Sequence, residues 1–167
     1  GLGFTVWADL KHNKLYFKKY TLHTKIVVVS SIVLVVVPTI LFMYFERDGV
    51  EAGMPFADRF ITSLFAAVTP RTAGYNTVDL GAMTQASKLL TIILMFIGGC
   101  PGSTAGGVKT TSIVIIMVYI WSNLRNASGC NIYGRRLADE DIKKASMVIG
   151  LNLIMAVAAL LIISGMQ

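Results

Sequence analysis

Two long runs without a charged residue limit most strongly the folds that this chain can adopt. The first covers Ile26 to Phe45 and has 20 residues, and the second covers Ala145 to Gln167 and has 23. As a helix, each run is long enough to cross about 30 Å of hydrocarbon. Charged residues make up only 14% of the chain and hydrophobic residues 54%, whereas about a quarter of the residues in soluble domains are charged. The sequence therefore predicts an all-α membrane protein.

The net charge of +6 is unevenly distributed around these runs. Five lysines precede the first run: Lys11, Lys14, Lys18, Lys19 and Lys25. The charged residues directly after it are mainly acidic: Glu46, Asp48 and Glu51, with Arg47 as the only basic neighbour. A second basic group precedes the last run: Arg125, Arg135, Arg136, Lys143 and Lys144. Basic loops favour the cytoplasmic side, so both groups are predicted to be cytoplasmic. A nucleic-acid patch is the competing interpretation, but these residues directly flank hydrophobic runs.

A short amphipathic segment follows the first run. Phe56 to Val68 is too short to cross a bilayer, and its apolar residues recur at helical spacing. Pro55 can start a helix there, and Pro70 with Gly74 can end it. Both flanks are predicted to lie on the outer side, so the segment is either a re-entrant helix or an amphipathic helix on the outer surface.

A third apolar region, Leu89 to Leu124, contains a predicted break. It has 36 residues with one charge, Lys109, and as one straight helix it would extend about 54 Å. Gly98 to Gly107 contains five glycines and Pro101, which do not favour a helix. The same glycines also fit GxxxG spacing, which marks close helix packing. A phosphate-binding loop is disfavoured, because Val108 separates Gly107 from Lys109.

The polar loop Thr69 to Thr77 lies between the short helix and the broken region. Its central residues are similar to the carbonyl-lined filter loop of potassium channels: Thr72, Ala73, Gly74, Tyr75 and Asn76. Carbonyl oxygens can replace the water around a cation if a glycine permits the backbone angles that turn them inward. Gly74 is the candidate for that glycine. The negative end of the preceding helix dipole also favours a cation there.

These segments follow one another as a span, a pore helix, a filter loop and a broken span. This order makes the resemblance to one protein family specific. Phe65 to Leu80, FAAVTPRTAGYNTVDL, and Phe96 to Thr111, FIGGCPGSTAGGVKTT, resemble the third repeat of the Trk/Ktr/HKT superfamily of potassium transporters. The likeness is closest to the bacterial KtrB/TrkH-type pore subunit. In that family, four span-loop-span repeats surround one ion path, and each repeat contributes a filter loop with a central glycine.

The resemblance implies roles for named residues. It implies that K+ is held by main-chain carbonyl oxygens of four filter residues, Thr72, Ala73, Gly74 and Tyr75. Arg71 and Asn76 would support the filter. It also implies a gate loop below the filter, made of Gly98, Gly99, Gly102, Ser103, Thr104, Gly106, Gly107 and Lys109. For Arg71 and Lys109, ionisable residues at predicted membrane depth, a structural brace and direct ion control both stay open.

The resemblance also divides the chain. Residues 1–25 would be a cytoplasmic basic segment that ends the preceding repeat, and 26–124 the third channel-like repeat. Residues 125–144 would be a cytoplasmic connection, and 145–167 the truncated first helix of the fourth repeat. The other repeats would belong to the same longer polypeptide.

The expected function is that of the pore-forming subunit of a potassium uptake system in the cell membrane, a multi-pass protein. The implied partners are a second copy in a homodimer, a cytoplasmic nucleotide-binding regulatory ring and membrane lipid, without nucleic acid. No cofactor is expected in this chain, K+ is the transported ion, and Na+ coupling stays open. The alternatives are a membrane scaffold packed through glycines and a sodium-conducting relative.

An enzyme is not expected. His12 and His23 stand apart from any nucleophile, and the acidic cluster Asp139 to Asp141 is interpreted as a solvated loop. No disulfide is predicted between Cys100 and Cys130.

Overall fold

The fold is that of a computed structural model, which describes residues 2–13, 20–71, 73–125, 131–132, 135–136 and 138–165. Within these residues the regular secondary structure is α-helical, apart from two antiparallel strands of two residues each. The helices are α1 (Phe4–Asn13), α2 (Leu22–Phe45), α3 (Phe56–Val68), α4 (Gln85–Phe96), α5 (Thr110–Leu124) and α6 (Asp139–Gly165). The strands β1 (Asn131–Ile132) and β2 (Arg135–Arg136) lie between α5 and α6. The prediction of an all-α fold is confirmed.

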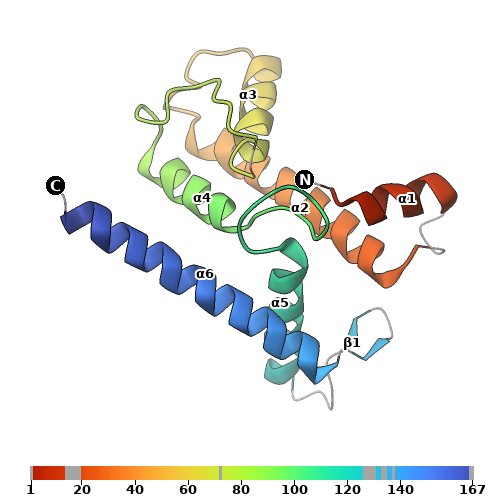
Figure 1. Ribbon diagram of the computed structural model, residues 1–167. Coiled ribbons are helices and arrows are strands. Elements are labelled where there is room, and N and C mark those ends of the chain that lie inside the picture. The colour runs from red at the N-terminus through yellow and green to blue at the C-terminus, as the bar shows by residue number, and fades with distance from the viewer. Residues whose placement is uncertain are drawn as a thin grey trace.

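Helix α2 is the central element, and α1, α3, α4 and α5 all contact it (Figure 1). Its start is capped by Thr21, whose side chain accepts a hydrogen bond from the N–H of Thr24. Together with α6, it is one of two described helices that are long and apolar enough to cross a membrane. Helix α2 therefore matches the first predicted span, with a start four residues earlier than Ile26.

Helix α3 has the predicted bounds and lies against α2. Pro55 occupies its N-cap position, and the helix ends before Thr69. The buried side chains of Phe42, Ala67, Met83 and Leu94 form a cluster between α2, α3, the following loop and α4. This small core fixes the short helix next to the end of α2.

The predicted break in the third apolar region is confirmed. Helix α4 ends at Phe96 and α5 begins at Thr110, so the whole stretch from Gly98 to Gly107 lies between helices. Because these glycines are not helical, the GxxxG interpretation of helix-to-helix packing is wrong for this segment.

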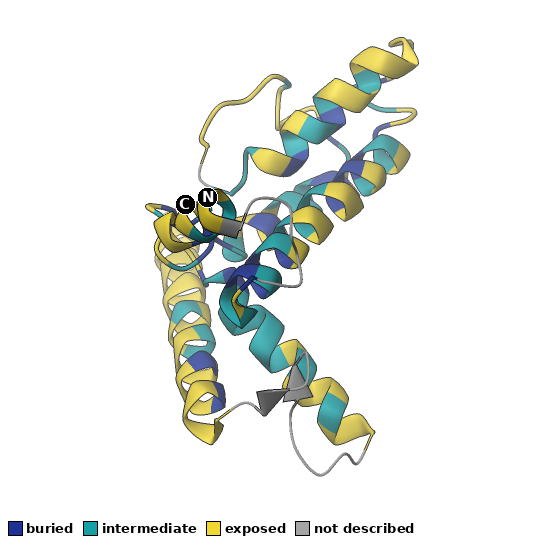
Figure 2. Ribbon diagram, turned by 90° about the vertical axis from the view of Figure 1, so that its right-hand side faces the viewer, coloured by how far each residue is buried: buried dark blue, intermediate teal, exposed yellow. Residues whose placement is uncertain are grey.

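Helix α6 begins at Asp139, six residues before the predicted start at Ala145. Its first turn contains Asp139, Glu140 and Asp141, so the interpretation of this acidic cluster as a loop is wrong. Acidic side chains stabilise the positive end of the helix dipole, which explains the early start. The helix contacts α5 and is exposed along most of its length (Figure 2).

Candidate functional site

The predicted filter loop begins directly at the end of α3. The N–H of Ala73 donates to the carbonyl oxygen of Thr69 at 3.1 Å, and the hydroxyl of Thr69 donates to the carbonyl oxygen of Tyr75 at 2.7 Å. Gly74 has a φ of +79°, a backbone conformation that side-chain-bearing residues rarely adopt. The hydrogen bond from the Thr69 hydroxyl thus closes the loop around Gly74, whose backbone conformation favours a residue without a side chain.

The other predicted filter residues lie beside Gly74. Ala73, Tyr75 and Asn76 are exposed in this chain, whereas Thr72 lies outside the described residues. Gly74, Tyr75 and Asn76 border a cavity of about 390 Å³, which α3 and α4 also line through Phe65 and Met95. One face of the loop therefore borders apolar side chains of α3 and α4.

The glycine segment, Gly98 to Gly107, forms a loop that returns to its starting point. The N–H of Gly98 donates to the carbonyl oxygen of Val108 at 3.0 Å, and the N–H of Val108 donates to that of Phe96 at 3.2 Å. The two ends of the segment are joined as a parallel bridge between Ile97 and Val108. Figure 1 shows the resulting loop between the end of α4 and the start of α5.

Lys109 holds this segment from its C-terminal end. Its ammonium group donates to the carbonyl oxygen of Ala105 at 2.6 Å. Lys109 is also the N-cap residue of α5. Ala105 is buried. Of the two alternatives for Lys109, this contact favours a brace.

The two predicted loops meet at a second cavity, of about 470 Å³. The filter loop contributes Arg71 and Ala73, and the glycine segment contributes Thr104 and Ala105. The remaining walls come from the N-terminal segment, α2 and α3, through Leu2, Ser31, Val35 and Val68. Segments about 30 residues apart in the sequence thus border one space.

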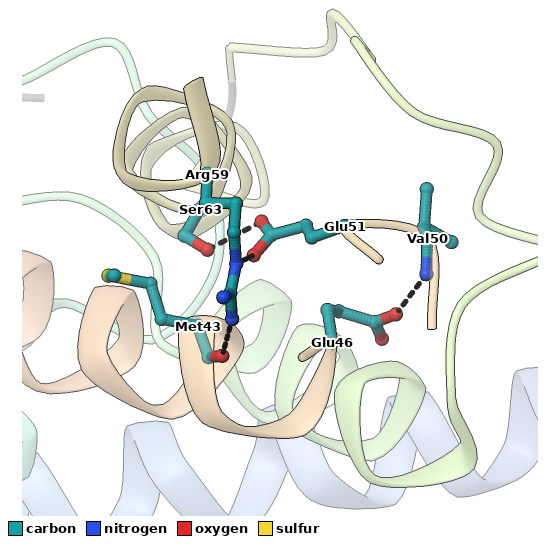
Figure 3. A network of polar contacts seen from close by, with 6 residues as sticks. All are labelled: Met43, Glu46, Val50, Glu51, Arg59 and Ser63. Atoms are coloured by element: carbon teal, nitrogen blue, oxygen red, sulfur yellow. Dashed lines mark hydrogen bonds and ion pairs between the residues drawn. The ribbon is translucent and has the colours of Figure 1, made fainter. Parts of the chain in front are cut away.

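A buried polar network that the sequence did not predict ties α3 to the end of α2 (Figure 3). The hydroxyl of Ser63 donates to Oε1 of Glu51 at 2.6 Å, and Nε of Arg59 forms an ion pair with Oε2 of Glu51 at 3.8 Å. The same guanidinium donates to the carbonyl oxygen of Met43 at 3.0 Å. Burial raises the pKa of Glu51, and Ser63 and Arg59 only partly oppose this effect.

Glu46 joins the end of α2 to the start of α4. Its carboxylate accepts hydrogen bonds from the N–H of Val50 at 3.1 Å and from the N–H and the hydroxyl of Thr84, both at 2.9 Å. Burial alone would raise the pKa of Glu46, but these hydrogen bonds and one from Ser87 together lower it. The carboxylate is therefore held in its charged form between two helices.

Two sequence signals could have pointed to this network. Arg59 is an ionisable residue in a short apolar helix, and such a residue needs a partner. Glu46, Asp48, Glu51 and Asp58 are the acidic residues between the first span and Arg59. Which of them pairs with Arg59 follows only from the fold.

The comparisons with known proteins decide the family. The TrkH family, described as cation transport proteins, matches residues 5–167. The chain belongs to the TrkH family. This confirms the resemblance stated from the sequence, and the family is one of cation transport proteins and not of enzymes.

Three relatives illustrate the match to TrkH-family proteins. The potassium/sodium uptake protein NtpJ of Enterococcus hirae is 36% identical over 98% of this chain and 36% of its own length. The Ktr system potassium uptake proteins B of Bacillus subtilis and Vibrio alginolyticus are 35% and 32% identical, over 89% of this chain and 34% and 33% of their own lengths. The chain thus spans about a third of the length of these relatives.

Proposed function

We propose that this chain supplies one repeat of the pore-forming subunit of a potassium uptake system, together with the first helix of the next repeat. The observation that carries the proposal is the cavity of about 470 Å³, which the loop around Gly74 and the glycine segment both border. A selectivity filter and a gate need such a shared space, because an ion that leaves the first must pass the second. Membership of a family of cation transport proteins supports this role.

In the proposed filter, main-chain oxygens of Thr72, Ala73, Gly74 and Tyr75 hold dehydrated K+ together with oxygens from the other repeats. The positive φ of Gly74 supports this assignment, because it turns the backbone where the loop needs to change direction. The bond from Thr69 to the carbonyl oxygen of Tyr75 fixes the loop and uses one of the two lone pairs of that oxygen. Arg71 and Asn76 support the filter from its flanks.

In the proposed gate, the glycine segment blocks or clears the path below the filter. Non-helical backbone at membrane depth is tolerated where it is buried in protein or lines a watery cavity. Two observations support this role: the ends of the segment are joined by backbone hydrogen bonds, and the segment borders the shared cavity. Lys109 acts as its brace.

The complete protein is proposed to be a multi-pass protein of the cell membrane with its basic loops in the cytoplasm. It works as a homodimer with a cytoplasmic regulatory ring that binds nucleotide, which docks near residues 125–144. The relatives named as Ktr system proteins support a system with more than one component. Na+ is the second candidate ion, since one relative is named a potassium/sodium uptake protein.

Rubidium uptake by the full-length protein in cells that lack their own potassium uptake systems tests transport. We expect uptake of Rb+ that exceeds the uptake of Na+. Expression in the membrane without uptake of either ion would contradict transport, and uptake of Na+ above Rb+ would establish the sodium-conducting alternative.

The variant Gly74→Ala tests the filter, and Gly53→Ala is its matched control. The two glycines have φ values of +79° and +80°, and a Cβ at either would meet nothing within 4 Å. Both substitutions therefore introduce the same backbone strain of about 1–2 kcal/mol. Gly74→Ala should reduce the preference for Rb+ over Na+, and Gly53→Ala should not. An unchanged preference in Gly74→Ala would contradict the filter assignment.

Deletion of Gly102 to Gly106 tests the gate. The shortened loop cannot fill the space below the filter, so uptake should rise above that of the parent protein. Uptake equal to that of the parent would contradict a gating role.

A further inference from the structure

The N-terminal segment lies directly against the glycine segment. Gly3 is buried, and a Cβ at this position would overlap with the carbonyl oxygen of Pro101. The N–H of Phe4 donates to the carbonyl oxygen of Gly102 at 3.4 Å. Figure 1 shows the start of α1 beside this loop and α2. The contact is between two backbones, and only a glycine at position 3 allows it.

The contact continues along the first turn of α1. Val6 is fully buried and forms a cluster with Val27 of α2 and Cys100 of the glycine segment. Cys100 is fully buried and also lies 3.5 Å from the hydroxyl of Ser31 and 3.4 Å from that of Thr110. Through Cys100, the glycine segment therefore contacts α1, α2 and α5.

We infer that Gly3 is a positioning residue for the glycine segment, and that the contact of residues 2–10 with Cys100, Pro101 and Gly102 sets how often this segment clears the ion path. The inference rests on the proposed gating role of the segment. A movement of α1 changes the position of Pro101 and Gly102, because backbone atoms in contact cannot yield as a flexible side chain can.

The population of the open path then depends on this contact. A loop in two arrangements shifts toward the second when contacts that exist only in the first are lost. The N-terminal contact belongs to the arrangement described here. Weakening it should raise the fraction of time in which the path is open, and it should leave ion coordination in the filter unchanged.

The variant Gly3→Ala in the full-length protein tests this inference. Overpacking of a backbone contact should raise the maximal rate of Rb+ uptake by about tenfold. The Rb+ concentration at half-maximal uptake and the preference over Na+ should stay at parent values, since the filter sets them. A merely structural role of Gly3 would instead lower the amount of folded protein and with it the maximal rate.

Labelling of Cys100 by a membrane-permeant maleimide gives a second readout, followed by mass spectrometry of the peptide that contains this residue. A displaced N-terminal segment should expose the thiol and accelerate labelling by about tenfold. Gly150→Ala is the control, because it adds the same methyl group where nothing lies within 4 Å. It should leave both the rate of uptake and the labelling unchanged.

The outcomes separate the inference from the proposed function. Parent-level labelling and uptake in Gly3→Ala, in a parent that transports Rb+, would overturn the inference alone, whereas a parent that transports neither Rb+ nor Na+ would overturn the proposed function. If Gly3→Ala does not accumulate in the membrane, Val6→Ala replaces it, because this substitution removes a contact and adds none. Parent-level labelling of Cys100 in Val6→Ala would overturn the inference as well.

Discussion

The hydroxyl of Ser63 donates a hydrogen bond of 2.6 Å to Oε1 of Glu51, and both residues are buried. Ser63 lies in α3, five residues before the helix ends at Val68, and Glu51 lies in the loop after α2. The bond therefore connects the helix that carries the proposed filter loop with the end of the central span. Arg59, one turn earlier on α3, reaches the same carboxylate.

Replacing Ser63 by alanine should destabilise the protein by about 1–3 kcal/mol, because Oε1 of the buried Glu51 loses its donor. The midpoint of thermal unfolding of the full-length protein in detergent measures the effect. Ser146→Ala is the matched control: its hydroxyl donates to the carbonyl oxygen of Ile142 in its own helix, and the residue is exposed. Equal midpoints for the two variants would contradict a structural role for the bond.

The pH dependence of stability should reveal Glu51. Its pKa is raised above the ordinary value of 4.5, mainly by burial, so the folded state binds the proton more tightly than the unfolded state. Glu51 therefore contributes stability at low pH, and this contribution is lost as the pH rises from about 4.5 through the raised pKa, at no more than about 1.4 kcal/mol per pH unit.

Glu51→Gln removes this titration and keeps an acceptor for Ser63. As the pH rises from 4.5 toward neutrality, the unfolding midpoint of Glu51→Gln should rise relative to that of the parent. Glu46 has a lowered pKa and the opposite sign: its contribution is present above 4.5 and lost as the pH falls. Glu46→Gln should therefore lose stability relative to the parent mainly at higher pH. Parallel pH curves for the parent and Glu51→Gln would exclude a raised pKa.

Local signals explain what the sequence predicted correctly. Pro55 and Pro70 stand on either side of α3, and its bounds match the prediction. The five glycines from Gly98 to Gly107 interrupt the third apolar region, and the helices stop on either side of them. In both cases the residues that determine the backbone lie within the element itself or next to it.

Contacts between distant residues explain what the sequence did not predict. Glu46 bonds to Thr84, 38 residues away, and the burial of Val6 depends on Cys100. Hydrophobic periodicity contains no information on such pairs. The start of α6 differs from the prediction for another reason: a cluster of charged residues is typical of a solvated loop, although acidic residues also stabilise the first turn of a helix.

The two ends of the glycine segment cross where Gly98 approaches Gly106 and Gly107, and this crossing predicts different effects for two glycines. A Cβ at Gly98 would overlap with the carbonyl oxygen of Gly106 and lie 2.9 Å from the Cα of Gly107, whereas one at Gly106 would meet nothing within 4 Å. Gly98→Ala should therefore destabilise the protein by about 1–3 kcal/mol, and Gly106→Ala should have little effect on stability. The thermal midpoint and the amount of protein in the membrane measure both, and a Gly106→Ala variant that is equally destabilised would argue against the crossing.

Lys109 provides a test of how firmly the glycine segment is held. A hydrogen bond from a charged donor contributes about 1.5–3 kcal/mol, and Lys109→Met removes the bond to the carbonyl oxygen of Ala105. The segment should then move more readily, so Rb+ uptake by the full-length protein should rise. Lys88→Met is the matched control, since Lys88 donates a similar bond to the carbonyl oxygen of Gly81 at an exposed site.

Labelling of Cys100 separates the brace from direct ion control in the Lys109→Met variant. Loss of a brace loosens the whole segment, so Cys100, which is fully buried against α1 and α2, should react faster with maleimide. Loss of a positive charge that only repels K+ would raise uptake and leave this thiol protected. Faster uptake with unchanged labelling would therefore assign Lys109 to the ion path, because the segment would have kept its packing.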